Sequence, residues 1–143
     1  MVCNTIVSRF TGPPLPHEVV GRKLSGGPLY PPSEVLELLG RQGNGVVRAW
    51  SRDCIRDVQK LDFVADDLAE LIAQALQDGR FLGSEWCVQK PEGPWAACDA
   101  YSLRRQEWIE AAAKHMSSEY YIKFAISKTG LLLFLASCHL SRS

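Results

Sequence analysis

The spacing of apolar residues changes from a helical to an alternating pattern near residue 80. Upstream, apolar side chains recur three and four positions apart, which predicts a helix with one apolar face. They are Leu68, Leu71, Ile72, Ala75 and Leu76. Downstream, Ile122, Phe124 and Ile126 alternate with Tyr121 and Lys123, which is typical of a strand with one buried face. The chain is therefore expected to belong to the α+β class, with N-terminal helices packed on a mainly antiparallel β-sheet.

Capping residues and turn residues divide the two halves into elements. Ser33 and Ser51 are expected to cap the first two helices, Asp62 to open the third, and Gly79 to end it. A short strand or extended link is expected over 45–50. Strands are expected over 81–89 and 95–103, joined by a turn over 90–94, and over 120–127 and 131–138, joined by a turn over 127–130. The last strand is expected near the centre of the sheet.

The segment 104–116 is interpreted as a helix inserted in the sheet. Ile109, Ala112, Ala113 and Met116 form an apolar stripe at helical spacing.

Residues 1–32 differ from the rest of the chain because proline and glycine are frequent there. Such a segment neither propagates a helix nor supports the interior of a sheet. We expect an N-terminal arm over 1–32, which Val19, Val20, Leu29 and Tyr30 could fix to a single domain over 33–143.

Composition excludes several classes of protein. Sixteen Lys and Arg residues balance sixteen Asp and Glu residues, which argues against a strongly basic nucleic-acid binder. The longest apolar run, 131–136, is far shorter than the ~20 residues of a membrane span, and no signal peptide is recognised. Five cysteines without a CxxC pair predict reduced thiols. The expectation is a cytoplasmic protein without a membrane segment, a metal site or a cofactor.

Short segments of this chain resemble the MqsR toxins of bacterial type II toxin–antitoxin modules. Trp95-Ala-Ala-Cys-Asp99-Ala-Tyr101 resembles the family's "WQDVY", and Tyr121-Ile-Lys123-Phe resembles its "YLKI" or "YVKF". Further segments follow in the family's order: 33–39, 47–48, 57–63, 71–81 and 137–139.

The resemblance implies a RelE-like fold and a metal-independent endoribonuclease, an mRNA interferase. It implies single-stranded mRNA as the substrate and a cognate antitoxin protein as the partner. In the family, a small cluster of Lys, Gln, Tyr and Lys cleaves RNA through attack of the ribose 2′-OH on the adjacent phosphate. That reaction needs a base, cations that stabilise the phosphorane, and an acid for the leaving oxygen.

Carried over by position, the resemblance implies Tyr121, Lys123 and His139 as catalytic residues. His139 falls where the family has its C-terminal lysine, and a histidine can exchange a proton near neutral pH. An exposed terminal histidine and an ordinary polar strand face are the alternative interpretations. The other expected site residues bind substrate: Arg104, Arg105, Asp99, Tyr101 and Cys98. If Asp99 is buried, its expected role is instead to accept hydrogen bonds from backbone donors.

Two departures from the family pattern suggest other functions. Gly83 stands at a family lysine and Cys98 at the family glutamine. One alternative is a catalytically degenerate relative that acts as a protein-interaction or regulatory module. Another is a cysteine-dependent enzyme that uses Cys98 or Cys138, with His139 as its base.

Overall fold

Three α-helices and six strands make up the part of the chain that the computed structural model describes, residues 5–11 and 23–140. This confirms the α+β class. The elements in chain order are β1 Lys23–Leu24, α1 Pro32–Gln42, the 3-10 turn η1 Gly43–Val46, β2 Val47–Ala49, α2 Arg52–Leu61, α3 Ala65–Asp78, β3 Arg80–Val88, β4 Trp95–Ile109, the 3-10 turn η2 Glu110–Ala112, β5 Lys114–Ile126 and β6 Leu133–Leu140.

All six strands belong to one sheet in the order β1-β3-β4-β5-β6-β2. Its pairs are antiparallel except β2 with β6, which is parallel, so the prediction of a mainly antiparallel sheet is confirmed. β6 lies between β5 and the edge strand β2 and not at the centre. The strands expected over 81–89, 120–127 and 131–138 correspond to β3, the second half of β5, and β6.

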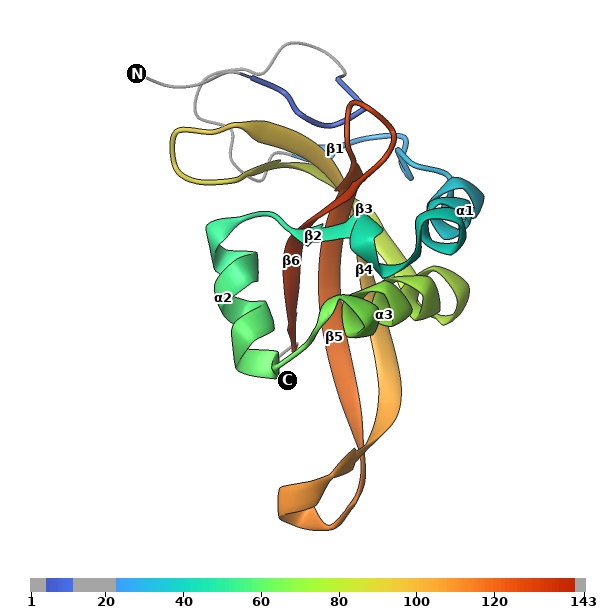
Figure 1. Cartoon of the computed structure of the whole chain (residues 1–143). Helices are drawn as coiled ribbons and strands as arrows, with labels where there is room; N and C mark the ends of the chain where they lie inside the picture. Colours follow the sequence, from blue (N-terminus) through green and yellow to red (C-terminus); the bar gives the residue numbers. More distant parts are fainter. Residues whose placement is uncertain (1–4, 12–22, 141–143) are drawn as a thin grey trace.

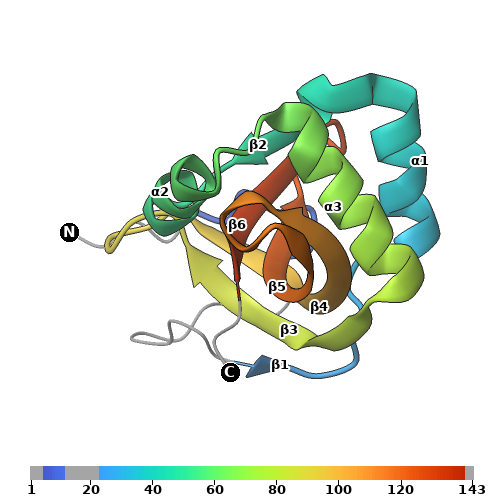
Figure 2. The same cartoon turned by 90° about the horizontal axis from the view of Figure 1, so that it is seen from below.

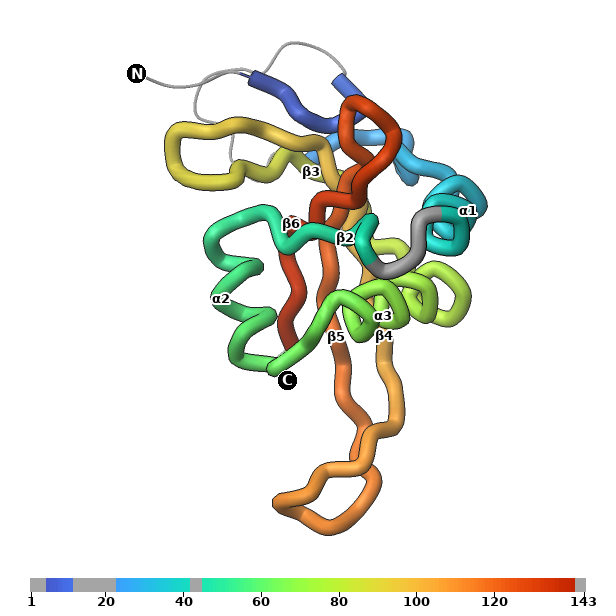
Figure 3. The backbone as a smooth tube through the Cα atoms, viewed as in Figure 1, coloured from blue at the N-terminus to red at the C-terminus, as the bar shows by residue number. Residues whose placement is uncertain are grey.

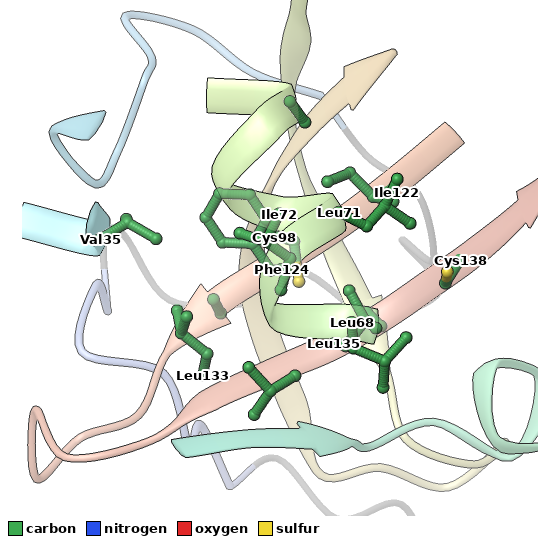
Figure 4. Packing of buried hydrophobic residues seen from close by; sticks show 14 of the residues in the cluster. Val35, Leu68, Leu71, Ile72, Cys98, Ile122, Phe124, Leu133, Leu135 and Cys138 are labelled. Atoms are coloured by element: carbon green, nitrogen blue, oxygen red, sulfur yellow. The ribbon is translucent and has the colours of Figure 1, made fainter. Parts of the chain in front are cut away.

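The helices pack on the sheet, and the core lies between them, with the strands supplying most of its buried residues. α1 and α3 pack against each other beside the sheet, and α2 packs on β6 (Figure 1). α3 buries Leu68, Leu71, Ile72 and Ala75, which confirms the helical spacing seen in the sequence. Figure 4 shows Leu68, Leu71 and Ile72 of α3 close to residues of β5 and β6. The core residues labelled there from the two strands are Ile122, Phe124, Leu133, Leu135 and Cys138.

Two of the four expected helix boundaries are confirmed. The Ser51 hydroxyl accepts a hydrogen bond from the backbone N–H of Cys54 at 3.0 Å and caps α2. Gly79 ends α3, and a Cβ there would lie 2.5 Å from the carbonyl oxygens of Ala75 and Ser102. Only glycine therefore allows α3 to approach β4 so closely.

The other two expected boundaries are wrong. α1 begins at Pro32, before Ser33, because proline suits the first turn, where backbone N–H groups have no helical partner. Asp62 ends α2 in a left-handed conformation (φ 57°) and does not open α3. α3 begins at Ala65, and the Asp67 carboxylate accepts a hydrogen bond from the N–H of Val64.

The prediction of a helix over 104–116 is also wrong, because β4 and β5 continue through this segment as a long hairpin. Residues pair from Asp99 with Phe124 out to Ile109 with Lys114. β3 begins opposite Ser102 and β6 ends opposite Tyr120, so the ribbon beyond them, residues 103–119, has two strands only. We call it the β4–β5 arm, and it extends well past the helices (Figures 1 and 3). Cross-strand pairing here outweighs local helix propensity, and only η2 at the tip is helical.

The described parts of the N-terminal segment pack against the sheet. Val7 N–H donates to the carbonyl of Trp95 at 2.9 Å, and Arg9 N–H donates to that of Ile126 at 2.8 Å. Tyr30 is fully buried in the core, as expected for a residue that fixes the segment. Val19 and Val20 lie outside the described residues.

The sheet curls until the chain after β2 meets the end of β3 (Figure 2). Arg52 N–H donates to the carbonyl of Gln89, and the Gln89 side chain donates to the carbonyl of Trp50, both at 3.1 Å. These contacts bring the N-terminus of α2 beside β3 although β2 and β3 are not neighbours in the sheet. Within the described ranges, no helix has the length and apolar character needed to cross a membrane.

Candidate functional site

A cavity of about 440 Å³ opens where the curled sheet meets the N-terminus of α2. The end of β3 and the following turn form one wall, and the start of α2 forms another. Lys123 of β5 and a short stretch of β6 contribute the rest. The charged side chains along the cavity are Arg52, Asp53, Glu85, Lys90 and Lys123.

Lys123 and Glu85 form an ion pair in this cavity. Lys123 Nζ lies 3.0 Å from Glu85 Oε1, and the two side chains are only 17% and 9% exposed. Lys23 Nζ lies 3.6 Å from the same oxygen. Burial lowers the pKa of Lys123, but the thiol of Cys87 and the carboxylate of Glu85 raise it more, so the net pKa lies above the usual value. Lys123 therefore remains a cation at neutral pH.

Tyr121 and His139 lie next to Lys123 on the same face of the sheet. Lys123 pairs with Ser137, and Tyr121 pairs with His139, across β5 and β6. The rings of Tyr121 and His139 are 5.2 Å apart, and Lys123 Nζ is 5.4 Å from the centre of the Tyr121 ring. The structure thus brings together the three residues that the resemblance implies as catalytic.

The ring of His139 contacts the backbone of the next residue. Nδ1 lies 3.2 Å from the carbonyl oxygen of Leu140. In the tautomer that carries its proton on Nδ1, this atom donates to the carbonyl, and Nε2 of the exposed side chain is a hydrogen-bond acceptor.

Two further cations line the cavity and were not expected from the sequence. Arg52 is the first residue of α2, and Lys90 follows β3 in the turn. With Lys123 they outnumber the acids Asp53 and Glu85. The positive end of the α2 dipole also lies at this wall, so the cavity favours an anion. No local signal distinguished Arg52 or Lys90, because both reach the cavity only through the curl of the sheet.

Cys87 is half-buried and lines the cavity, and the sequence did not single it out. The neighbouring Cys98 and the charge of Lys123 lower the pKa of Cys87, whereas burial and the carboxylate of Glu85 oppose this. Cys98 is fully buried, and burial raises its pKa well above the usual value. These neighbours come from separate strands, so no sequence motif could reveal them.

Asp99 and Tyr101 lie on the opposite face from the Tyr121–His139 pair. The Asp99 carboxylate is buried and accepts hydrogen bonds from the N–H groups of Leu29 and Tyr30. This confirms the structural role expected for a buried Asp99. Tyr101 is also buried and stacks on Phe124, with ring centres 5.7 Å apart.

Arg104 and Arg105 lie on the β4–β5 arm, away from the cavity. Arg104 forms an exposed ion pair with Glu119 at 3.4 Å. Arg105 is bound to Glu107 at 3.0 Å and lies 4.8 Å from the centre of the Tyr120 ring. The sheet register places Arg104, but not Arg105, on the face that carries Tyr121.

Comparison with protein-family models, with curated proteins and with solved structures finds no match to this chain. The site is therefore interpreted from its own chemistry. Within residues 5–11 and 23–140, no group of three or more His, Cys, Asp or Glu side chains is arranged to hold a metal ion. An ammonium, a phenol and an imidazole beside a cationic cavity are suited to binding a phosphate and transferring protons around it.

Proposed function

We propose that this protein is an endoribonuclease that cleaves single-stranded RNA at the face formed by Tyr121, Lys123 and His139. One observation carries the proposal: β5 and β6 bring these three side chains together, and Lys123 among them lines a cavity that favours anions. The MqsR resemblance adds the biological setting, a cytoplasmic toxin that cleaves mRNA and is held by a cognate antitoxin.

The reaction follows from the roles these groups can take. Nε2 of His139 removes the proton of a ribose 2′-OH, whose oxygen attacks the adjacent phosphorus. The O2′–P bond forms, the P–O5′ bond breaks, and the leaving 5′ oxygen takes its proton from water. The products are a 2′,3′-cyclic phosphate and a 5′-hydroxyl. Lys123 and Arg52 stabilise the charge of the phosphorane, and the Tyr121 hydroxyl donates to a phosphate oxygen.

An RNA cleavage assay tests this proposal. The purified protein is incubated with end-labelled single-stranded RNA in the presence of a chelator, and the ends of the products are analysed. We expect cyclic phosphate ends, and rates about 10²–10⁴-fold lower for His139→Ala, as for loss of a general base. Tyr121→Phe and Lys123→Met are also expected to be slower. Lys114→Met at the arm tip is the matched control and keeps the wild-type rate.

Two outcomes would overturn the assignment. No cleavage by the folded wild-type protein would remove the proposed activity. Full cleavage by both Tyr121→Phe and His139→Ala would place the chemistry elsewhere.

A second candidate function is the non-catalytic relative that binds a partner protein. Lys123 is already bound to Glu85, and Cys98 at the family glutamine position is fully buried. Expression in a bacterial host separates the two functions. Growth arrest that His139→Ala relieves favours the nuclease, whereas a harmless protein that binds a partner tightly favours the interaction module.

The cysteine-dependent enzyme based on Cys98 or Cys138 finds less support in the geometry. Both side chains are fully buried, and burial raises the pKa of Cys138 to about 12. Neither thiol lines the cavity.

A further inference from the structure

The outer edge of β4 is open along the β4–β5 arm. β3 begins opposite Ser102, and within the described residues no strand pairs with the far side of 103–109. Figure 1 shows the arm extending past the helices. A two-stranded ribbon is at best marginally stable by itself, and an unpaired edge is a template for another strand. Proline or a bulge often protects such an edge, but 103–109 has no proline and no register shift.

The sequence of this edge is complementary to itself. We consider two copies of the strand that run antiparallel about a two-fold axis at Gln106. Arg105 of one copy then faces Glu107 of the other, and Arg104 faces Trp108. Opposite charges, and a cation beside an aromatic ring, are favourable pairs. Each pair occurs twice because the interface is symmetric, and the two Gln106 amides can bond to each other at the axis.

The charges select this register over its neighbours. In an antiparallel pair, two facing residues either both bond across the pair or neither does, and the two kinds alternate along a strand. A two-fold axis must therefore pass beside a residue and not between two residues. An axis at Arg105 would place two guanidinium groups opposite each other, and an axis at Glu107 would oppose two carboxylates. Like charges in facing positions are destabilising, so Gln106 is the favoured centre.

The side chains that this pairing uses are accessible. Trp108 is 51% exposed, and the Arg104 side chain is 71% exposed. Arg105 and Glu107 are bound to each other at 3.0 Å on the other face of the arm. A guanidinium has five N–H donors and a carboxylate has about four acceptor positions, so both groups can also bind a second copy.

We propose that two copies of this chain pair through residues 104–108 of β4, so that their arms join into one sheet in the order β5-β4-β4-β5. Each arm then ends before the β3 strand of the other copy begins opposite Ser102. The contact is one short strand pair, smaller than most stable protein interfaces, so the dimer is weak and depends on concentration. This inference does not depend on the proposed RNA cleavage.

Disulfide cross-linking at the axis tests the geometry. Facing residues in antiparallel strands have Cα atoms about 4.5–5.5 Å apart, a distance that a disulfide spans. The parent carries Cys3→Ser and Cys87→Ser, because Cys3 lies outside the described residues and Cys87 is partly exposed. Under mild oxidation, Gln106→Cys in this parent is expected to give a covalent dimer on a non-reducing gel.

Ser117→Cys is the matched control for cross-linking. Ser117 is also exposed and pairs with Gln106 across the arm. In the proposed dimer it lies three strand spacings, roughly 14 Å, from its own copy, so this variant is expected to stay monomeric. The proposal is overturned if Gln106→Cys does not cross-link, or if both variants cross-link equally.

An exchange of charges tests the recognition, with sedimentation velocity at up to about 1 mM protein. The wild type is expected to dimerise as concentration rises. Glu107→Arg and Arg105→Glu are each expected to be monomeric, because like charges then face each other. An equimolar mixture of the two variants is expected to dimerise, since every arginine then faces a carboxylate. A wild type that stays monomeric, or a mixture that does so, would overturn the proposal.

Two exposed positions provide a test with little effect on the fold. Trp108→Ser is expected to raise the dimer dissociation constant about fivefold or more, because two cation–aromatic contacts are lost. Met116→Ser is the control, because Met116 is 41% exposed on the same arm but belongs to β5. Circular dichroism checks that both variants keep the fold. A larger effect of Met116→Ser than of Trp108→Ser would place the contact on a different surface and contradict the pairing through β4.

Discussion

Asp99 is a buried carboxylate that joins three separate segments of the chain. Its oxygens accept hydrogen bonds from Leu29 N–H at 2.9 Å, Tyr30 N–H at 3.0 Å and the Ser84 hydroxyl at 2.6 Å. Burial raises the pKa of Asp99, and these hydrogen bonds only partly oppose the effect. This one side chain therefore holds the N-terminal segment against β3 and β4.

Asp99→Asn is expected to lower the free energy of unfolding by about 1–3 kcal/mol at neutral pH. The amide NH₂ must face the N–H of either Leu29 or Tyr30, so one buried donor loses its acceptor. Urea titrations of wild type and variant measure the loss. The exposed Asp78→Asn serves as the control, and an equal effect in both would contradict the role of Asp99.

The free energy of unfolding that Asp99→Asn loses depends on pH in a definite direction. Because the folded protein raises the pKa of Asp99, it binds the proton more tightly than the unfolded chain does. The stability that this protonation contributes is present below the unfolded pKa and is lost as pH rises through the folded one. The stability difference between wild type and Asp99→Asn should therefore shrink from acidic to neutral pH.

The candidate site shows which residues sequence reasoning can find. Tyr121 and Lys123 are two positions apart on an alternating strand, so their common face was predictable. The pairing of Tyr121 with His139 needs the β5–β6 register, which includes a shift between Lys123 and Phe124. Cys87 lines the cavity together with residues of α2, β5 and β6, so its place could not be found from local sequence.

At the scale of elements, Ser51 links a helix to the sheet. Its hydroxyl accepts from Cys54 N–H as the cap of α2 and donates to the carbonyl of Ala136 in β6 at 2.7 Å. Because Ser51 and Ala136 also line the cavity, this link positions the cavity wall.

Ser51→Ala is expected to destabilise the protein by roughly 1–2 kcal/mol, the upper part of the range for loss of a helix cap, because a β6 carbonyl also loses its donor. Thermal or urea unfolding followed by circular dichroism measures the change. Ser33→Ala is the control, because Ser33 is exposed inside the first turn of α1 and should change stability by less than about 0.5 kcal/mol. Equal losses in the two variants would show that Ser51 has no special role.

Elements with local signals were predictable, and elements defined by a distant partner were not. α3 followed from its apolar face, and the turn over 127–130 from its composition. The β4–β5 arm was mistaken for a helix because both of its faces are largely exposed, so apolar residues do not alternate along it. Residues 104–109 are held extended by pairing with residues 114–119. The spacing of apolar residues within one short segment gives no information about such a pairing.

At the scale of the whole molecule, the segment 5–11 connects parts of the sheet that are distant in sequence. Ile6 bridges to Trp95 and Ser8 bridges to Ser127, so the segment joins the start of β4 to the turn after β5. The fully buried Ser8 hydroxyl accepts from Ala97 N–H at 3.0 Å and donates to the Phe10 carbonyl at 2.7 Å.

Ser8→Ala is expected to lower the free energy of unfolding by about 1–3 kcal/mol, because the buried N–H of Ala97 loses its acceptor. Urea unfolding followed by tryptophan fluorescence is a suitable measurement, since Trp86 and Trp95 pack in the cluster that Ile6 and Phe10 cover. Ser117→Ala on the exposed arm should have no measurable effect. A loss no larger than that of Ser117→Ala would argue against a structural role for this segment.

The curl of the sheet was not predictable from the sequence. The parallel pairing of β2 with β6 joins residues from opposite halves of the chain, and Gln89 meets Trp50 only after the sheet has curled. Proline content in the first 32 residues indicated an arm, but Asp99 and Trp95 provide the partners that order its described parts.

The tip of the β4–β5 arm, η2, is exposed and lies far from the helices (Figure 3). Exposed tips of this kind tolerate inserted sequence well. A fluorescent domain or an affinity tag placed between Ala112 and Ala113 would be held away from the proposed catalytic face by the arm itself. The arm tip is thus an attachment site through which the protein can be immobilised or imaged while both chain ends stay unmodified.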